Sequence, residues 1–545
     1  MIYHTNATQT SPHSRHFQML QKTVTTKTLT EKCKTLTQFK QLHAQIIKSH
    51  LPDNPIAIGP LLSALATTSN NPPFFSYARS IFENLKFRNT FMYNTMIRGY
   101  VMNGENLLAV MCFKDMLKFG FLANGYTFSP LIKACLGSGF VGLERVGVTV
   151  HGFVLKLGFG DDGFVGSGLI EFYAGKCEMG DGRKVFDEMS VKDVVVWTSL
   201  IDGYGKNEDV ESARMVFDEM PRKSVVSWSA MMAAYSRVGE FEEVVCLFET
   251  MQELGVRPNE SVLVSVLTAC GNIGALAQGL WVHSYAKRYH LDSNTILATA
   301  LVDMYSKCGY PDLALSVFKS ISVKDTGAWN ALISGLSMNG KARTSLDLLN
   351  QMASVKIQPS AATFVAILTA CTHANLVKEG VELFNQMDKG YGVKPQFEHY
   401  ACVVDLFARA GMLEEAMEFV ENRLGGVGKG DANVWGALLG ACRTYENVDV
   451  GNKVWRKLVE MKVSDYGVCV VSYNMYKEAG WKREAEEVRN MISELGLKKT
   501  PGCSAVEVDG VVREFVSGDN THSMTQEIHK TLDSLVNMAR LLELH

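Results

Sequence analysis

The sequence predicts an all-α fold, a stacked solenoid of helix–turn–helix repeats, and two observations support this fold class. The segment VVWTSLIDGYGKNEDVESARMVFDEM (195–220) recurs in altered form throughout the chain, and Phe186, Phe217 and Phe248 follow one another at equal intervals. Repeats with a period of roughly 20–50 residues are typical of solenoids, whose units bury their apolar faces only against neighbouring units. The chain is also 545 residues long, which is too long for one globular core and natural for such an array.

Composition narrows the class of protein further. Hydrophobic residues make up 47% of the chain, so most of it is expected to fold, and the net charge is −3 at pH 7. A general nucleic-acid binder is usually basic, so this balance counts slightly against one, although a local positive groove stays compatible with it. No run approaches 18 apolar residues, so no membrane span is expected. The twelve cysteines stand singly, without C-x-x-C, so no zinc or dithiol site is expected.

The first 28 residues are assigned to an organellar transit peptide. Residues 1–30 contain no Asp or Glu, hold ten Ser or Thr, and carry the cations Arg15, Lys22 and Lys27, which is typical of such peptides. An ordinary disordered terminus is the alternative. Residues 29–54 follow as a degenerate leading repeat.

The repeat tract covers residues 55–431, and each unit is set to begin four residues before a recurring Asn, Ser or Thr. Within 225–259, two amphipathic helical patterns flank Gly239, which is expected to end the first helix. The units are 55–89, 90–124, 125–162, 163–193, 194–224, 225–259, 260–294, 295–325, 326–360, 361–396 and 397–431.

Two apolar positions recur within the units. Aromatic residues occupy the fourth position, where base stacking is conceivable but core packing is favoured, because the polar fifth residue beside it must face another way. Cysteines occupy the eleventh position of several units, where a small apolar residue at a tight helix contact is expected. The aromatics are Tyr93, Trp197, Trp228, Trp329, Tyr400 and Trp435, and the cysteines are Cys135, Cys270, Cys371 and Cys442.

These units resemble pentatricopeptide repeats (PPR) of the plant P, L and S subclass. The longer units that end in Pro-Asn or Pro-Ser, 225–259 and 326–360, look P-type. The shorter units that end in Lys-Asp, 163–193 and 295–325, look S-type. Units with an Ala-Cys core and a Val-His pair (Val150-His151, Val282-His283) look L-type. The resemblance implies a right-handed superhelical solenoid, the α-α superhelix of this family.

The C-terminal part extends the resemblance. Residues 432–499 resemble two E-type repeats, and residues 500–545 resemble the PG-box or E+ extension that precedes a DYW deaminase domain, with at most a small hairpin near 504–516. That deaminase needs H-x-E and C-x-x-C, and neither motif occurs in these residues. We therefore expect an E/E+ type protein lacking the DYW domain, with no catalytic residue, no metal site, no cofactor and no enzymatic activity.

The family reads single-stranded RNA with one repeat per base, through the fifth residue of a unit and its last residue. The resemblance therefore implies base-reading pairs in six units. Each residue taken singly could be an ordinary helix cap, and Val264 and Val365 occupy the fifth place of two L-type units that should read weakly. The pairs are Asn94 with Asn124 (pyrimidine), Ser167 with Asp193 (G), Thr198 with Ser224 (leaning purine), Ser229 with Asn259 (A), Thr299 with Asp325 (G), and Asn330 with Ser360 (leaning pyrimidine).

The resemblance implies sequence-specific binding of single-stranded RNA in a plant organelle, expected to be the mitochondrion, with the chloroplast as the alternative. The most specific role it implies is site recognition for C-to-U RNA editing. A DYW-type deaminase or other editing factors would be recruited in trans through residues 432–545, with no membrane partner. An organellar RNA stability, splicing or translation factor is one alternative. A protein-binding helical scaffold without RNA is the other; the net charge favours it slightly and the polar fifth residues argue against it.

Overall fold

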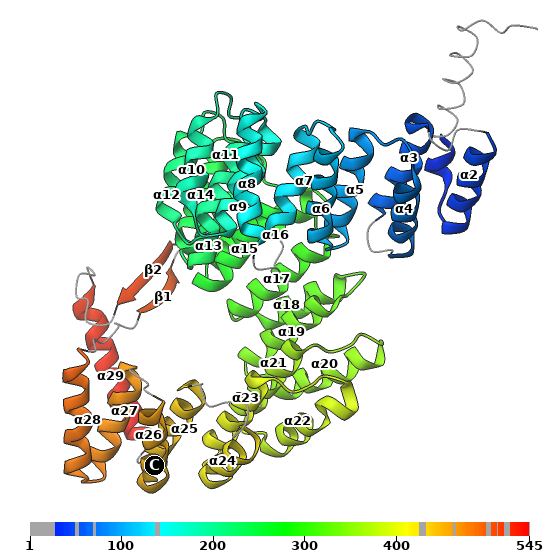
Figure 1. Ribbon diagram of the computed structural model, residues 1–545. Coiled ribbons are helices and arrows are strands. Elements are labelled where there is room, and N and C mark those ends of the chain that lie inside the picture. Colours follow the sequence, from blue (N-terminus) through cyan, green and yellow to red (C-terminus); the bar gives the residue numbers. More distant parts are fainter. Residues whose placement is uncertain are drawn as a thin grey trace, which may run out of the picture. The chain divides into compact units, whose positions relative to one another are not determined.

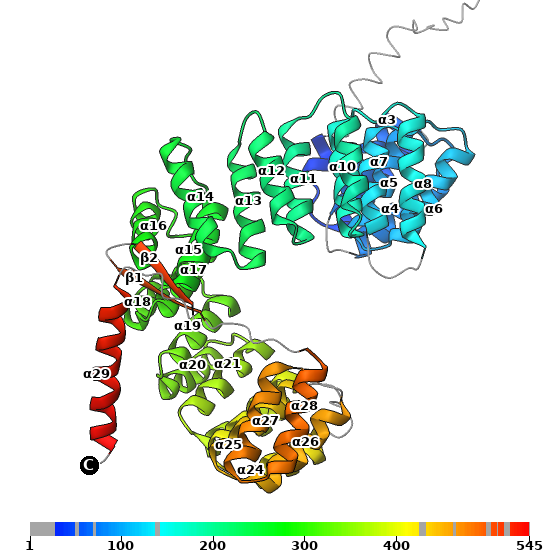
Figure 2. The same cartoon turned by 90° about the vertical axis from the view of Figure 1, so that its left-hand side faces the viewer.

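The computed structural model describes residues 28–49, 54–68, 72–136, 142–424, 432–461, 465–496, 503–508, 511–516 and 524–543. The predicted transit peptide over residues 1–28 lies, apart from residue 28, outside these ranges. The chain divides into two compact units, Met1–Gly239 and Glu240–His545, and each is described by itself. Figures 1 and 2 show that both consist almost entirely of helices. No helix in the described ranges is both long and apolar enough to cross a membrane.

The N-terminal unit is a stack of antiparallel helix pairs. Its helices are α2 (Leu36–Lys48), α3 (Pro55–Thr67), α4 (Pro72–Asn84), α5 (Thr90–Met102), α6 (Asn106–Lys118), α7 (Gly125–Leu136), α8 (Leu143–Lys156), α9 (Gly163–Gly175), α10 (Met179–Glu188), α11 (Val194–Lys206), α12 (Val210–Glu219) and α13 (Val225–Val238).

The C-terminal unit continues with the same type of pair. Its helices are α14 (Phe241–Glu253), α15 (Glu260–Ile273), α16 (Leu276–Arg288), α17 (Thr295–Lys307), α18 (Pro311–Ser320), α19 (Thr326–Met338), α20 (Ala342–Ser354), α21 (Ala361–His373), α22 (Val377–Tyr391), α23 (Phe397–Arg409), α24 (Leu413–Phe419) with the π-helical turn η1 (Val420–Leu424), α25 (Ala432–Thr444), α26 (Val448–Glu460), α27 (Tyr466–Glu478), α28 (Lys482–Glu494) and α29 (Thr525–Glu543). Strands β1 (Cys503–Val508) and β2 (Val511–Val516) form an antiparallel hairpin that pairs Cys503 with Val516 and Val508 with Val511.

The odd-numbered helices from α3 to α27 are the first helices of the pairs, and those from α3 to α23 begin at the residues where the repeat register begins, from Pro55 to Phe397. Successive first helices pack directly on each other, as α9 on α11 on α13 in one unit and α17 on α19 on α21 in the other. Within each compact unit the first helices therefore form one layer and their partners form a second. The predicted all-α stack of helix–turn–helix units is confirmed, and the two strands that the structure describes fall where a small hairpin was expected.

The aromatic residues of the fourth position belong to the core. Five of the six pack edge-on against the recurring phenylalanine of the preceding second helix, and Trp228 and Tyr93 are almost fully buried. Such edge-to-face pairs stabilise the interface beyond the apolar area they bury. The ring-centroid distances are 5.2 Å for Phe82–Tyr93, 4.7 Å for Phe186–Trp197, 4.9 Å for Phe217–Trp228, 4.9 Å for Phe318–Trp329 and 5.2 Å for Phe384–Tyr400.

The lysine of the Lys-Asp ending completes this contact. The ammonium of Lys192 lies 5.1 Å from the centre of the Phe186 ring and donates a hydrogen bond to the carbonyl oxygen of Met189. Lys324 repeats the arrangement over Phe318, at 5.2 Å, with the carbonyl oxygen of Ile321. The lysine thus satisfies a carbonyl at the end of a second helix and covers its aromatic ring.

The cysteines of the eleventh position are buried at a close approach between the two helices of a unit. A Cβ placed on Gly147 would lie 3.2 Å from Cβ of Cys135, and one on Gly380 would lie 3.2 Å from Cβ of Cys371. Cys442 lies in the same way against Gly451, at 3.3 Å. Burial raises the pKa of the Cys135, Cys371 and Cys442 thiols to about 11, so at neutral pH these side chains are neutral packing groups.

We expect Gly147→Ala to lower the free energy of unfolding by about 1–3 kcal/mol, the usual cost of overpacking. A Cβ at this position would lie 2.3 Å from Cζ and 2.4 Å from Cε2 of Phe172, a buried ring on the next first helix. Gly152→Ala, on the same helix α8, is the matched control because no atom lies within 4 Å of its Cβ position. It should raise helix stability by up to about 1 kcal/mol. Equal thermal unfolding temperatures for the two variants would contradict this account of the packing.

The Val-His pairs have a structural role at the contact with the following unit. Nδ1 of His151 lies 2.8 Å from the hydroxyl of Tyr173, and Nδ1 of His283 lies 2.7 Å from the hydroxyl of Tyr305. His43 and Tyr77 repeat the contact in the degenerate leading repeat, at 2.8 Å. Burial is the main cause that lowers the pKa of all three imidazoles; the carboxylates of Glu188 and Asp181 partly oppose it at His151.

A lowered histidine pKa makes the fold less stable in mild acid. As pH falls through about 6.5, the unfolded chain binds protons that the folded chain binds only at lower pH, so the free energy of unfolding decreases. We expect the thermal unfolding temperature to drop between pH 7.5 and pH 5.5. His151→Gln and His283→Gln keep a polar side chain that does not titrate, so the doubly substituted protein should show a smaller drop. An equal drop in both proteins would assign the effect to other groups.

Candidate nucleic-acid interface

The six fifth-position residues lie on first helices and are all partly exposed. Each is followed four and eight residues later by side chains on the same helical face. In each compact unit, one face of the first-helix layer therefore carries the fifth, ninth and thirteenth positions. The fifth-position residues are Asn94 on α5, Ser167 on α9, Thr198 on α11, Ser229 on α13, Thr299 on α17 and Asn330 on α19.

The last residue of a unit acts as the N-cap of the next first helix. Oδ1 of Asp193 accepts the backbone N–H of Val196 at 2.9 Å, and Oδ1 of Asp325 accepts that of Ala328 at 2.8 Å. Asn259, Ser224, Asn124 and Ser360 sit at the same place before α15, α13, α7 and α21. A capping bond fixes the side chain and occupies one oxygen. In Asp193 the second carboxylate oxygen, Oδ2, lies beside Gly163 at the start of α9.

The two asparagine readers are each held by two hydrogen bonds. Nδ2 of Asn94 donates to Oδ1 of Asn124 at 2.9 Å, and Oδ1 of Asn94 accepts the hydroxyl of Thr127 at 2.6 Å. The structure therefore brings this predicted pair together. Thr127 is fully buried, so it orients the Asn94 amide from below.

The same arrangement recurs on α19. Nδ2 of Asn330 donates to Oγ of Ser360 at 3.1 Å, and Oδ1 of Asn330 accepts the hydroxyl of Thr363 at 2.5 Å. Each amide retains one N–H and one lone pair for a further partner, so it can both donate and accept. Sequence reasoning missed Thr127 and Thr363. The signal was present, because in both units a threonine follows the asparagine at the same interval along the chain.

The hydroxyl readers make a different pattern. Oγ1 of Thr299 donates to the carbonyl oxygen of Thr295 at 2.7 Å, and Oγ1 of Thr198 donates to that of Val194 at 2.7 Å. Oγ of Ser167 donates to the carbonyl oxygen of Phe164 at 3.1 Å. Since the hydroxyl proton is used within the helix, these oxygens are presented as acceptors.

The position of Asp193 matches this acceptor character. A Cβ on Gly163 would lie 2.7 Å from Oδ2 of Asp193, so the free carboxylate oxygen lies against α9, one turn from Ser167. Ser167 and Asp193 thus offer two acceptors near the N-terminal end of α9, which suits a donor-rich edge such as the N1–H and N2–H₂ side of guanine. Ser229 and Asn259, in contrast, belong to different compact units.

A cavity of about 330 Å³ surrounds the first predicted pair. Asn94 and Asn124 line it together with the rings of Phe91 and Tyr126 and with Arg98. Its polar, aromatic and cationic groups are those that a nucleotide needs for base contacts, stacking and phosphate pairing. Gly59, at the fifth position of the first unit, is instead buried beneath Phe91, whose Cε1 would lie 3.2 Å from a Cβ there.

Phe91 and Tyr126 are examples of an exposed apolar residue at the second position of a unit. Such a residue is unexpected at the solvent-facing start of a helix, since apolar side chains normally face the core. The exposed fraction runs from 49% for Val195 to 83% for Tyr126. These side chains lie one turn from the reading residues, and sequence reasoning missed them. The set is Ile56, Phe91, Tyr126, Phe164, Val195, Val226 and Ile296.

The cations on this face are mostly paired with carboxylates. Nζ of Lys206 lies 2.7 Å from Oδ2 of Asp202, and Nζ of Lys307 lies 2.9 Å from Oδ2 of Asp303. All four side chains are partly exposed, and exposed pairs of this type contribute about 0–1 kcal/mol. A phosphate can therefore compete for the lysine.

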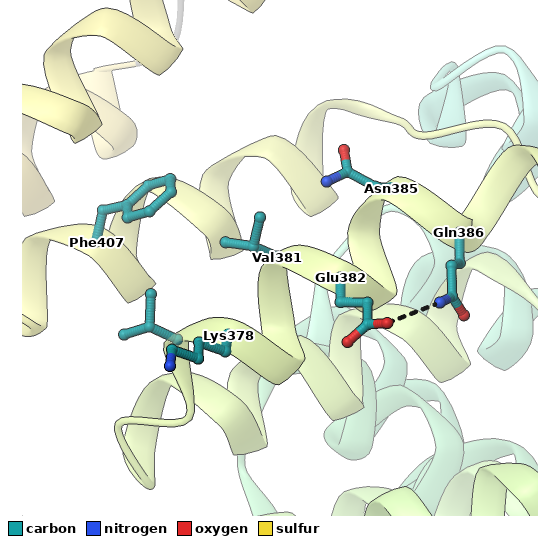
Figure 3. A pocket seen from close by; sticks show the side chains of 7 residues that line it. Lys378, Val381, Glu382, Asn385, Gln386 and Phe407 are labelled. Carbon is teal, nitrogen blue, oxygen red and sulfur yellow. Dashed lines mark hydrogen bonds between the residues drawn. The ribbon is translucent and has the colours of Figure 1, made fainter.

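Another surface depression lies outside this face. It measures about 610 Å³ and is formed by α22 and Phe407 of α23 (Figure 3). Lys378, Val381, Glu382 and Gln386 line it, and Nε2 of Gln386 donates to Oε1 of Glu382 at 3.4 Å. None of the predicted base-reading residues contributes. Within the described part of the chain, no group of three or more His, Cys, Asp or Glu side chains could hold a metal ion.

Comparison with known proteins identifies the repeat. A pentatricopeptide repeat-containing protein of Arabidopsis thaliana is 37% identical over 526 residues, which cover 93% of this chain and 80% of the relative. The chain belongs to the pentatricopeptide repeat family. Stretches that match the PPR repeat family are 88–137, 223–272 and 324–373, and stretches that match the PPR repeat are 195–225, 297–325, 362–390 and 398–422. The E motif matches residues 445–507. The protein is thus a plant PPR protein of the PLS and E type.

Two further relatives carry organelle names. A PPR protein of Arabidopsis thaliana named as chloroplastic is 39% identical over 511 residues, covering 94% of this chain and 91% of the relative. Another, named as mitochondrial, is 38% identical over 458 residues, covering 84% and 66%. Among solved structures, the maize PPR protein PPR10 matches with 18% identity and a TM-score of 0.45 over 90% of this chain and 77% of that chain. PPR10 in complex with an 18-nucleotide psaJ RNA element matches with 14% identity and a TM-score of 0.46, over 87% and 83%.

Proposed function

We propose that this protein binds single-stranded RNA in a plant organelle and reads one base per repeat through the fifth and last residues of its units. The observation that carries the proposal is the cavity at Asn94, which is lined by a pair able to donate and accept, by two exposed aromatic rings and by Arg98. A base edge needs such hydrogen bonds, and a base face needs such rings. We assign the protein to the mitochondrion, with the chloroplast as the alternative. One relative named as mitochondrial and another named as chloroplastic support a location in an organelle.

The reading residues proposed are the six pairs predicted from the sequence. Asn94 with Asn124 and Asn330 with Ser360 would select pyrimidines, and Thr299 with Asp325 and Ser167 with Asp193 would select G. Ser229 with Asn259 would select A, and Thr198 with Ser224 would lean to purines. The exposed residues at the second position of the units would contact the flat faces of the bases. Such stacking does not depend on the identity of the base.

We further propose that the bound site is a C-to-U editing site and that the C-terminal region recruits a DYW-type deaminase or another editing factor in trans. The E motif at residues 445–507 supports a role beyond RNA binding. Helix α29 supports a protein contact, because Ile528, Leu532 and Leu535 project from it with 36% to 59% of their surface exposed. An apolar stripe of this kind is typical of a helix that binds a partner protein.

Selection from a random RNA pool by the purified full chain tests the RNA proposal. The expected enriched sequence, from 5′ to 3′, is pyrimidine, any base, G, purine, A, any base, G and pyrimidine. Affinity should fall with salt at a log–log slope of about −0.7 per phosphate contacted. Binding that ignores salt and selects no sequence would favour the protein scaffold instead.

C-to-U profiling of organelle RNA in a loss-of-function plant then separates editing from RNA stability, splicing or translation, since those roles leave every edited site unchanged.

A further inference from the structure

A second cavity lies on the face of the first helices, at the end of the repeat tract. It measures about 620 Å³ and lies between α21, α23 and α25. Its wall combines the ninth and thirteenth positions of the last repeat with the first helix that follows it. The polar, charged and aromatic side chains that line it include His373 on α21, Asp405 and Arg409 on α23, and Thr444 and Tyr445 at the end of α25.

Tyr445 is held in place while its ring stays accessible. Its hydroxyl donates to the carbonyl oxygen of Arg409 at 2.5 Å, and its Cε1 lies 3.0 Å from the Cβ position of Gly411. Gly411 has a φ of +76°, so a glycine both forms the turn and leaves room for the ring. Even so, 48% of the Tyr445 surface is exposed, on the side that lines the cavity. A fixed and half-exposed aromatic ring is a ready stacking platform.

The charges around the ring suit a phosphate. Arg409 and His373 are both exposed at the cavity. The ion pair of Arg409 with Asp405 uses the Nε atom, at 3.0 Å from Oδ2. The terminal amines of the guanidinium therefore remain as donors, and guanidinium groups bind phosphate oxygens well.

Base reading by polar pairs ends where this cavity begins. The fifth residues of the last two repeats are Val365 and Ala401, and neither side chain can hydrogen-bond a base edge. RNA that continues past Asn330 along the same face would therefore need contacts that do not depend on base identity. Stacking on a ring and pairing with a cation are such contacts.

We propose that this cavity holds a nucleotide of the RNA just beyond the bases that the polar pairs read, with its base stacked on Tyr445 and its phosphate near Arg409 and His373. The proposal rests on the RNA-binding function above and assigns it a further subsite. Tyr445 is also the first residue of the E motif match. The start of the C-terminal region thus contacts RNA and holds the strand where the recruitment segment begins.

Fluorescence anisotropy with the full chain tests this subsite. One RNA carries the selected sequence followed by six uridines at the end that extends past the tract, and a second RNA carries six abasic nucleotides there. Tyr445→Ala and Tyr445→Leu should weaken binding of the uridine RNA by roughly 5- to 150-fold, the usual effect of removing one stacking ring. Both variants should bind the abasic RNA as the wild type does. Arg409→Gln should weaken both RNAs and lower the salt slope by about 0.7.

Tyr445→Phe is the control because it keeps the ring, and it should bind the uridine RNA within a few-fold of the wild type. Circular dichroism and thermal unfolding check that each variant is folded; Tyr445→Leu retains the bulk over Gly411 if the alanine variant does not fold. Equal affinities of the leucine variant and the wild type for the uridine RNA would overturn the subsite and leave the base-reading function standing. A wild-type protein that binds neither RNA would overturn both.

Discussion

The double substitution Asn330→Thr with Ser360→Asp is expected to change the preferred base at one nucleotide from a pyrimidine to guanine. The change gives unit 326–360 the reading pair of unit 295–325, which lies beside it in the same compact unit. Every other nucleotide of the selected sequence should keep its preference, because each base contacts its own pair.

The physical reason is the exchange of a donor–acceptor amide for two acceptors. The Asn330 amide is fixed by Ser360 and Thr363, so it presents both an N–H and a lone pair. A threonine hydroxyl that donates to its own helix, as Thr299 does at 2.7 Å, presents only a lone pair. With an aspartate beside it, the site would accept two N–H groups, which among the bases suits guanine. The discrimination should amount to about 1–3 kcal/mol, or roughly 5- to 150-fold.

Binding selection and competition with RNAs that differ at this one nucleotide measure the change. Thr363→Ala is a useful companion, because it removes the hydroxyl that orients the Asn330 amide and should weaken discrimination without creating a new preference. The unsubstituted pair Thr299–Asp325 serves as an internal control and should go on selecting G. A new preference that spreads over several nucleotides, or an unchanged one, would show that the repeat register is wrong.

The positions of the helices could be predicted closely because interactions between residues near each other in the sequence determine where each helix begins. Asp193 and Asp325 precede helices whose first N–H groups they cap, and capping residues are a strong local signal. The recurring Phe186 and Phe217 revealed the period because each fills the same contact with the aromatic residue at the fourth position of the next unit. The capping residues and the recurring phenylalanines repeat with the same period, so each supports the repeat boundaries that the other predicts.

The parts that escaped prediction depend on contacts between repeats. Thr127 orients Asn94 from the following repeat, and no local rule assigns a partner so far along the chain. The sequence did not single out Tyr126 as an exposed ring, because exposure depends on how the next helix pair is placed. The Val-His pair served only to classify a unit, whereas His283 contacts Tyr305 of the following unit. The division into two compact units at Gly239 also has no signal in the repeat pattern.

The double substitution Leu532→Asp with Leu535→Asp is expected to reduce editing at the target site to background while RNA affinity stays within about twofold of the wild type. Both leucines are more than half exposed on α29, so the folded state should tolerate the change. Two carboxylates in an apolar contact would have to be desolvated without partners, which is costly enough to prevent binding of a protein on this face. Helix α29 carries none of the proposed base-reading residues, so the base preference of the protein should not change.

Ser534→Asp with Asn537→Asp is the matched control, since it adds the same charge to the same helix about half a turn away from the apolar stripe. Plants that lack the endogenous protein are complemented with each variant, and the fraction of C-to-U conversion is measured together with the abundance of the target transcript. The control should restore editing because it leaves Ile528, Leu532 and Leu535 in place. Full editing with the leucine variant would refute recruitment through α29. A transcript that is lost in the null plant and restored by both variants would instead assign the protein to RNA stability, because that role needs the bound repeats and no partner on this helix.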